Sequence, residues 1–137
     1  MKTSEHKQIV HKYVDSINQG KLNIINELCD RNYVYHGIGE ESRLSKEGYL
    51  NFLNEVRQAF PDFNIRIDDL VAEDDRVAYR MTVSGTHKGE FKGIAATGKK
   101  FTVSTVGEIL FKDGRIVEEW EIYDTIGMMS QLGALRT

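Results

Sequence analysis

Apolar residues recur at helical spacing through the first sixty residues of the chain. In residues 4–20 they fall at i, i+1, i+4, i+5 and i+8, which places them on one stripe of an amphipathic helix. A shorter second helix is predicted over 21–30, with Cys29 among its buried residues. A third helix is predicted over 45–60, where Ser45 is suited to cap the N-terminus.

After Pro61 the pattern changes to an alternation of apolar and polar residues, which is typical of strands with one buried face. Asp113-Gly114 is a strong signal for a two-residue hairpin turn, and the acidic residues 73–75 indicate another turn. Strands are therefore expected over 63–73, 76–87, 101–111 and 115–124, with a short strand or extended piece at 32–39, a glycine-rich loop at 87–100 and a terminal helical turn at 125–133.

Helices and strands are thus segregated along the chain, which predicts an α+β fold rather than a parallel α/β sheet. We expect three N-terminal helices to pack on one face of a mainly antiparallel sheet that curls into a cone. A cone closed at one end by helices encloses a pocket. No linker or low-complexity segment divides the sequence, so residues 1–137 are expected to form a single domain.

Charge and composition indicate which binding partners and which cellular compartment to expect. The 137 residues carry 18 basic and 21 acidic side chains, and the net charge of −3 argues against nucleic acid or an anionic membrane as partner. No apolar run approaches the ~20 residues that a membrane span needs, and the N-terminus lacks the apolar stretch of a signal peptide. A single cysteine suits a reducing compartment, so we expect a cytoplasmic protein.

The segment 118–124 carries the first candidate for chemistry. Strict alternation puts Glu118, Trp120, Ile122 and Asp124 on one side of a strand. If that side lines the pocket, burial would raise the pKa of Asp124 by about 3 and make it a general base near neutral pH. Alternatively, Asp124 caps the terminal helical turn, a role that Asp favours. The two roles can coexist.

Five further residues are candidates for the functional site, and each also has a simpler structural explanation. Trp120 is a wall that stacks on a ligand, or ordinary core. Arg80 and Glu108 interrupt apolar strands, and they could form a buried pair, bind an oxygen of a ligand, or face solvent. His36 and His87 could act as acid or base at neutral pH, or be hydrogen-bonded structural residues.

Several motifs that would signal other chemistry are absent from the sequence. There is no H-E-x-x-H, C-x-x-C, Walker glycine loop or G-x-S-x-G. Four scattered histidines and one cysteine give no metal-ligand spacing. We therefore expect neither a metal nor a nucleotide cofactor.

Four motifs follow one another in the second half of the chain: G-T-H-x-G at 85–89, A-T-G-K at 96–99, D-G-R-I-x-E-x-W-x-x-x-D at 113–124 and Q-L-G at 131–133. With these motifs the sequence resembles a known family, the SnoaL-like polyketide cyclases, also called ester cyclases. The segments FPDFNIRIDDLVAEDDRVAYR and YVYHG are similar to the family's middle and early strand, so the resemblance spans nearly the whole chain.

The resemblance implies an NTF2-like cone of helices against a strongly curved mixed sheet, in a homodimer. It also implies a cofactor-free mechanism, in which an acidic residue removes a proton next to a carbonyl and the enolate closes a ring by intramolecular aldol condensation. Asp124 matches that acid/base. The expected site comprises Asp124 and His36 as catalytic residues, with Trp120, Arg80, Glu108 and His87 binding the substrate.

The leading hypothesis is therefore an enzyme that performs metal-free acid/base chemistry on a small apolar carbonyl compound. A cyclase is one version, and an isomerase or hydrolase on the same scaffold is another. The alternative is a non-catalytic module that uses the cone to bind a small hydrophobic molecule or to dimerise.

Overall fold

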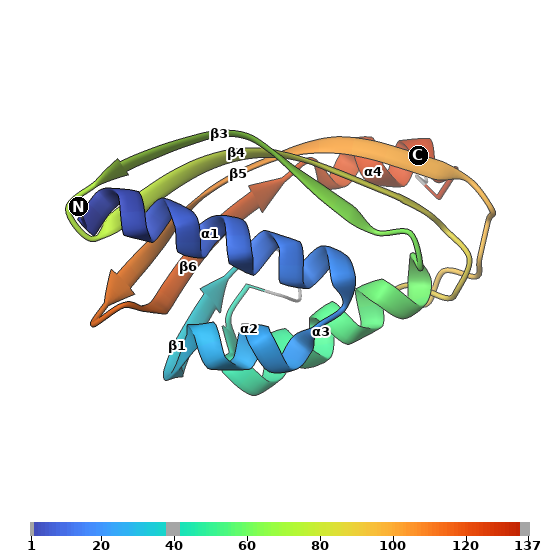
Figure 1. Cartoon of the computed structure of the whole chain (residues 1–137). Coiled ribbons are helices and arrows are strands. Elements are labelled where there is room, and N and C mark those ends of the chain that lie inside the picture. The colour runs from blue at the N-terminus through green and yellow to red at the C-terminus, as the bar shows by residue number, and fades with distance from the viewer. Residues whose placement is uncertain (1, 38–41, 135–137) are drawn as a thin grey trace.

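A computed structural model describes residues 2–37 and 42–134 of the chain. Figure 1 follows the elements from the N-terminus to the C-terminus. Their order is α1 (Lys2–Gln19), α2 (Leu22–Leu28), β1 (Cys29–His36), β2 (Leu44–Ser45), α3 (Lys46–Ala59), β3 (Asn64–Glu73), β4 (Arg76–Thr86), β5 (Lys100–Lys112), β6 (Arg115–Tyr123) and α4 (Thr125–Gln131).

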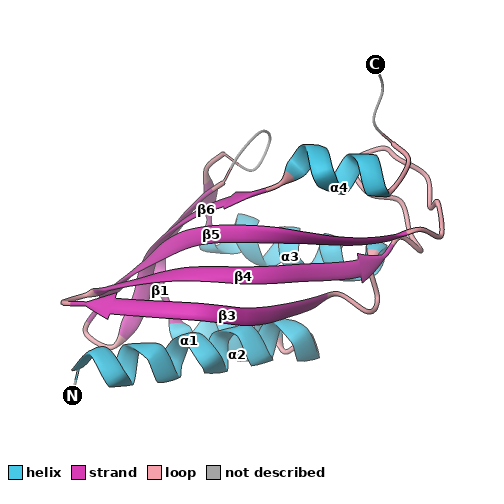
Figure 2. Cartoon of the chain, turned by 90° about the horizontal axis from the view of Figure 1, so that it is seen from above, coloured by secondary structure: helices cyan, strands magenta, loops and turns pink. Residues whose placement is uncertain are grey.

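The strands form one mixed sheet in the order β2-β1-β6-β5-β4-β3. Strand β1 runs parallel to β6, whereas the other neighbours are antiparallel. Seen from above, β3, β4 and β5 lie in front of α1, α2 and α3, so these helices cover one face of the sheet only (Figure 2). The predicted α+β fold, with N-terminal helices packed on a mixed sheet, is confirmed.

The helices form where their apolar stripes meet the sheet. Val10, Tyr13 and Val14 of α1 are buried, as is the stripe of α3 that includes Tyr49 and Leu53. The Ser45 hydroxyl accepts a hydrogen bond from the Gly48 amide, which confirms the predicted cap. No helix in the described part of the chain is long and apolar enough to cross a membrane.

The region around Cys29 differs from the sequence-based expectation. Cys29 was expected inside the second helix, but this helix ends at Leu28 and the extended backbone of Cys29 begins β1. The Cys29 amide still bonds the Ile25 carbonyl, so the last helical turn leads directly into the strand. Strand β1 therefore starts three residues before the predicted extended piece at 32–39, of which residues 38–39 lie outside the described residues.

The turns between the long strands follow their residue types. Asp113 and Gly114 both have positive φ, at 52° and 76°, which is the two-residue hairpin geometry that Asp-Gly favours. Asp74, with φ of 51°, lies in the turn between β3 and β4. Both predicted turns are confirmed.

Strand β6 contains an irregularity that decides which of its side chains face the helices. Phe111 pairs with Ile116, but the preceding Leu110 pairs with Glu118, so Val117 is an extra residue on β6. A bulge of this kind reverses the alternation beyond it. Glu119 and the residues two and four positions further on therefore face the helices, and the intervening residues face outward.

Candidate active site

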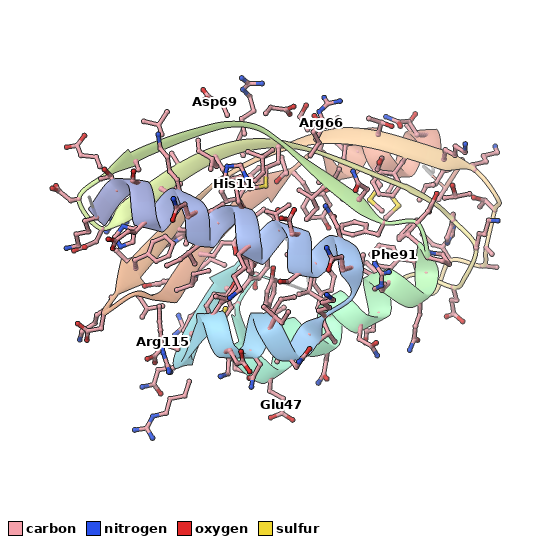
Figure 3. All side chains as sticks on the ribbon, in the orientation of Figure 1. His11, Glu47, Arg66, Asp69, Phe91 and Arg115 are labelled. Atoms are coloured by element: carbon pink, nitrogen blue, oxygen red, sulfur yellow. The ribbon has the colours of Figure 1, made fainter. Side chains whose placement is uncertain are left out.

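A cavity lies between the helices and the inner face of the sheet, and we call it the aromatic cavity. The space in it that the centre of a water-sized molecule can reach is about 80 Å³. Figure 3 shows Phe91, one of its lining residues, where the loop after β4 meets the C-terminal end of α3. Most of the rest of the wall consists of aliphatic residues and two tyrosines. The wall also contains five phenylalanines, Phe52, Phe60, Phe63, Phe91 and Phe101.

Glu121 places a carboxyl group in this apolar wall. Its Oε1 accepts a hydrogen bond from the Tyr35 hydroxyl at 2.5 Å, and its Oε2 accepts one from Thr105 at 3.0 Å. Burial raises the pKa of Glu121, while the hydrogen bonds from Tyr35 and Thr105 act in the opposite direction. The carboxyl is therefore more basic than one in water.

Glu119 lies two residues earlier on the same face of β6 and is only 3% exposed. Its Oε1 accepts hydrogen bonds from Tyr13 at 2.7 Å and Tyr33 at 3.2 Å, and its Oε2 accepts one from Tyr79 at 2.7 Å. Burial, followed by the charge of Glu121, raises the pKa of Glu119 to about 7. Two carboxyls of raised pKa thus lie side by side, one at the cavity and one behind it.

Asp124 does not lie in the cavity. It is exposed, and its carboxylate accepts a hydrogen bond from the Gly127 amide at 2.8 Å at the start of α4. The prediction that Asp124 occupies a water-poor pocket beside Trp120 is wrong. The alternation of residues 118–124 holds, but beyond the extra residue at Val117 the side that carries Trp120 faces away from the helices. The alternative prediction, a helix cap, is confirmed.

Trp120 and His36 pair on the outer side of the sheet. They are register partners on β6 and β1, and their rings stack with centroids 5.2 Å apart. The His36 Nε2 lies 2.5 Å from the Glu118 carboxylate. Trp120 was expected to line the pocket. It does not line the aromatic cavity, because beyond the bulge its side of β6 faces outward.

Arg80 and Glu108 do not form a buried pair, which was one of the possibilities, and Arg80 instead faces solvent, which was another. Arg80 is exposed on β4, opposite Val106 of β5, whereas Glu108 forms an ion pair with Arg76. The Glu108 side chain is 41% exposed, so this pair is at the surface. The outward side of β4 and β5 meets solvent here because the helices cover only the other face (Figure 2).

His87 directly follows β4 and is fully buried next to the wall of the aromatic cavity. Its ring lies 5.4 Å from that of Phe60, a lining residue, and its Nδ1 accepts a hydrogen bond from the Thr97 amide at 3.3 Å. This bond fixes the glycine-rich loop to the strand end. Substrate binding by His87 stays a prediction.

The sequence contained a signal for the two interior carboxyls. Tyr13, Tyr49 and Tyr79 fall on apolar faces of their predicted helices and strand, and buried phenols need hydrogen-bond acceptors. Glu119 and Glu121 supply such acceptors from the predicted strand over 115–124.

The described residues include no group of three or more His, Cys, Asp or Glu side chains arranged to hold a metal ion. The expectation that the protein works without a metal or nucleotide cofactor stays a prediction.

Fold and cavity together define an NTF2-like protein, in which helices and a mixed sheet enclose an apolar cavity with a carboxyl in its wall. The chain belongs to the SnoaL-like polyketide cyclase family, whose model matches residues 7–132. The family that the sequence motifs indicated is thereby confirmed.

Named relatives extend over nearly the whole chain. Aklanonic acid methyl ester cyclase AcmA of Streptomyces galilaeus is 28% identical, over 95% of this chain and 92% of its own length. The structure of IdmH, a candidate polyketide cyclase from Streptomyces antibioticus, matches with a TM-score of 0.82 at 31% identity, over 93% of this chain and 97% of that one. AclR, a candidate hydroxylase from Streptomyces galilaeus, matches with a TM-score of 0.87 at 30% identity, over 98% and 89%. Relatives of this chain thus include polyketide cyclases.

Proposed function

We propose that this protein is a cofactor-independent acid/base enzyme that acts on a small apolar carbonyl compound, with Glu121 as the base. The observation that carries this proposal is a carboxyl of raised pKa in an otherwise apolar, aromatic cavity. A carboxylate held away from water is a stronger base than one at the surface, which general base catalysis near neutral pH requires. The cyclases among the relatives support a substrate of this class.

The reaction that we propose is ring closure by intramolecular aldol condensation. Glu121 takes a proton from a carbon next to a carbonyl, and the electron pair of that C–H bond forms the enolate. The enolate carbon then bonds to a second carbonyl carbon of the same molecule, whose oxygen takes the proton back from Glu121. The phenylalanines of the cavity would hold a flat apolar substrate during these steps.

The test uses aklanonic acid methyl ester as a probe, because this compound appears in the name of a relative. We expect the purified protein to exchange the acidic C–H of the probe for deuterium in D₂O, measured by mass spectrometry, and to form a ring-closed product. Glu121→Gln should lower the exchange rate by at least about 100-fold, the lower end of what a general base contributes.

Asp124→Asn is the matched comparison, because it also removes one carboxylate from the same segment but on the outer side. We expect this variant to retain the exchange rate of the wild type. Retained exchange in Glu121→Gln together with loss in Asp124→Asn would overturn the proposal and return the base to Asp124.

A second candidate function is binding without chemistry, since hydrogen bonds from Tyr35 and Thr105 occupy both oxygens of Glu121. A carboxylate engaged in this way could orient a ligand and leave its protons in place. Binding of the probe by calorimetry, with no exchange above the rate in buffer, would favour this alternative.

A further inference from the structure

We propose that Glu119, Tyr79 and Glu121 form a proton relay, in which Glu119 stores the proton that Glu121 takes from the substrate. This inference rests on the proposed function and assigns a role to a carboxyl that does not itself line the cavity. Glu119 would be a positioning residue that acts through Tyr79, whereas Glu121 meets the substrate.

The register of the sheet brings the three groups together. Tyr79 on β4 is opposite Gly107 on β5, and Gly107 is opposite Glu121 on β6. A Cβ atom at Gly107 would lie 2.4 Å from the Tyr79 hydroxyl oxygen, so the phenol occupies the space that this glycine leaves. The hydroxyl thus passes over β5 and reaches the carboxyls of β6.

Tyr79 interacts with both carboxyls. Its hydroxyl donates a hydrogen bond to Glu119 Oε2 at 2.7 Å. The same hydroxyl is near enough to Glu121 to lower the pKa of that carboxyl against the effect of burial. A phenol has one proton to donate and an oxygen that accepts. It can therefore donate to one carboxylate while it accepts from a protonated partner.

The transfer balances without any further reactant. Protonated Glu121 gives its proton to the Tyr79 oxygen while the Tyr79 hydroxyl gives its own proton to Glu119. Tyr79 is neutral before and after, Glu121 becomes a carboxylate, and Glu119 becomes a carboxylic acid. The reverse transfer returns the proton for the last step of ring closure.

The groups packed around the pair favour this exchange because they are neutral donors. Burial, followed by the charge of Glu119, raises the pKa of Tyr13, Tyr33, Tyr49 and Tyr79, and burial with the charge of Glu121 does the same for Tyr35. Negative charge in the cluster is thus confined to the two carboxyls. The titratable groups that face the pair are Tyr13 from α1, Cys29, Tyr33 and Tyr35 from β1, Tyr49 from α3, and Tyr79 from β4.

The experiment is a carboxyl ¹³C NMR titration of the protein labelled at Glu Cδ, which needs no substrate. We expect the Glu119 and Glu121 signals to titrate as a coupled pair, each showing two steps, with an upper midpoint near neutral pH. Glu119→Gln should leave Glu121 with a single step whose midpoint is lower by about 1 pH unit or more, because a like charge is gone. Glu118→Gln, on the outer side of the same strand, should change neither signal.

Tyr79→Phe keeps both carboxyls and removes only the bridging hydroxyl. We expect the midpoint of the Glu119 titration to move to higher pH, because a donor to its carboxylate is lost. We also expect kcat for deuterium exchange of the probe to fall while KM stays unchanged. Independent titration of the two carboxyls, or an unchanged kcat in Tyr79→Phe, would overturn the relay while leaving Glu121 as base. Coupled titration without exchange by any variant would overturn the proposed function and the relay with it.

Discussion

At the scale of single residues, Glu119 couples the pH to the stability of the fold. Its carboxyl has a pKa of about 7 in the folded protein, against an ordinary value of 4.5. Between these two values the folded chain binds more protons than the unfolded chain. The free energy of unfolding is therefore highest below the unfolded pKa and falls as the pH rises through about 7.

We expect the free energy of unfolding to fall by about 3 kcal/mol between about pH 5 and pH 8, since each pH unit between the two pKa values corresponds to about 1.4 kcal/mol. Glu119→Gln should remove most of this dependence, because the amide does not titrate. Urea unfolding at a series of pH values measures it, with Glu118→Gln as the control that keeps the slope. An equally steep slope in Glu119→Gln would show that Glu119 is not its source.

The phenols could be placed from the sequence, but their acceptors could not. Tyr13 and Tyr49 follow the apolar period of their helices, so their burial was predictable. The acceptor of Tyr13 is Glu119, which lies 106 residues away in the chain. A hydrophobic pattern describes one helix or strand at a time, so it does not indicate which side chains of distant elements meet in the fold.

At the scale of elements, local residue types predicted where most helices and strands begin and end. One bulge determined which side chains of β6 face the cavity. The Ser45 cap and the Asp113-Gly114 turn are signals confined to a few residues, and both are confirmed. The extra residue at Val117 leaves no such signal, because Arg115 to Tyr123 reads as one continuous strand. One extra residue moves every later side chain of β6 to the other face, so Glu119 and Glu121 face the helices and Trp120 faces outward.

The short helix α4 gives a test of the role that the structure assigns to Asp124. Asp124→Ala removes the acceptor for the Gly127 amide and should lower the free energy of unfolding by about 1 kcal/mol. Asp124→Asn should retain nearly all of the stability, since Asn caps helices as well as Asp does. Urea unfolding of both variants measures the difference. Equal losses in the two variants would mean that the carboxylate acts by its charge rather than as a cap.

At the scale of the whole molecule, the sheet has a face that the helices do not cover. Arg66 and Asp69 point away from the helices on this side (Figure 3). Val106 and Ile122 lie opposite each other on β5 and β6 and are 47% and 63% exposed. Apolar side chains grouped on an open sheet face are typical of an interaction surface. We propose that two copies of the chain pair through this outer face.

Ile122→Glu places a charge in the middle of the proposed contact and should convert the dimer to a monomer. Light scattering at micromolar concentration should give about twice 15.7 kDa for the wild type and 15.7 kDa for the variant. Ala95→Glu, in the exposed loop after β4, is the control that should remain dimeric. A wild-type mass of one chain would contradict the pairing.

The buried position of Cys29 makes its chemical modification a measure of motion in the interior of the protein. The side chain is 1% exposed at the start of β1, and burial, followed by the charge of Glu119, raises the pKa of the thiol to about 12. The thiolate, not the thiol, attacks alkylating reagents, so burial and protonation both protect this single cysteine in the native protein. Modification of this sulfur therefore requires a local opening of the structure at the start of β1, and the modification rate measures how often that opening occurs.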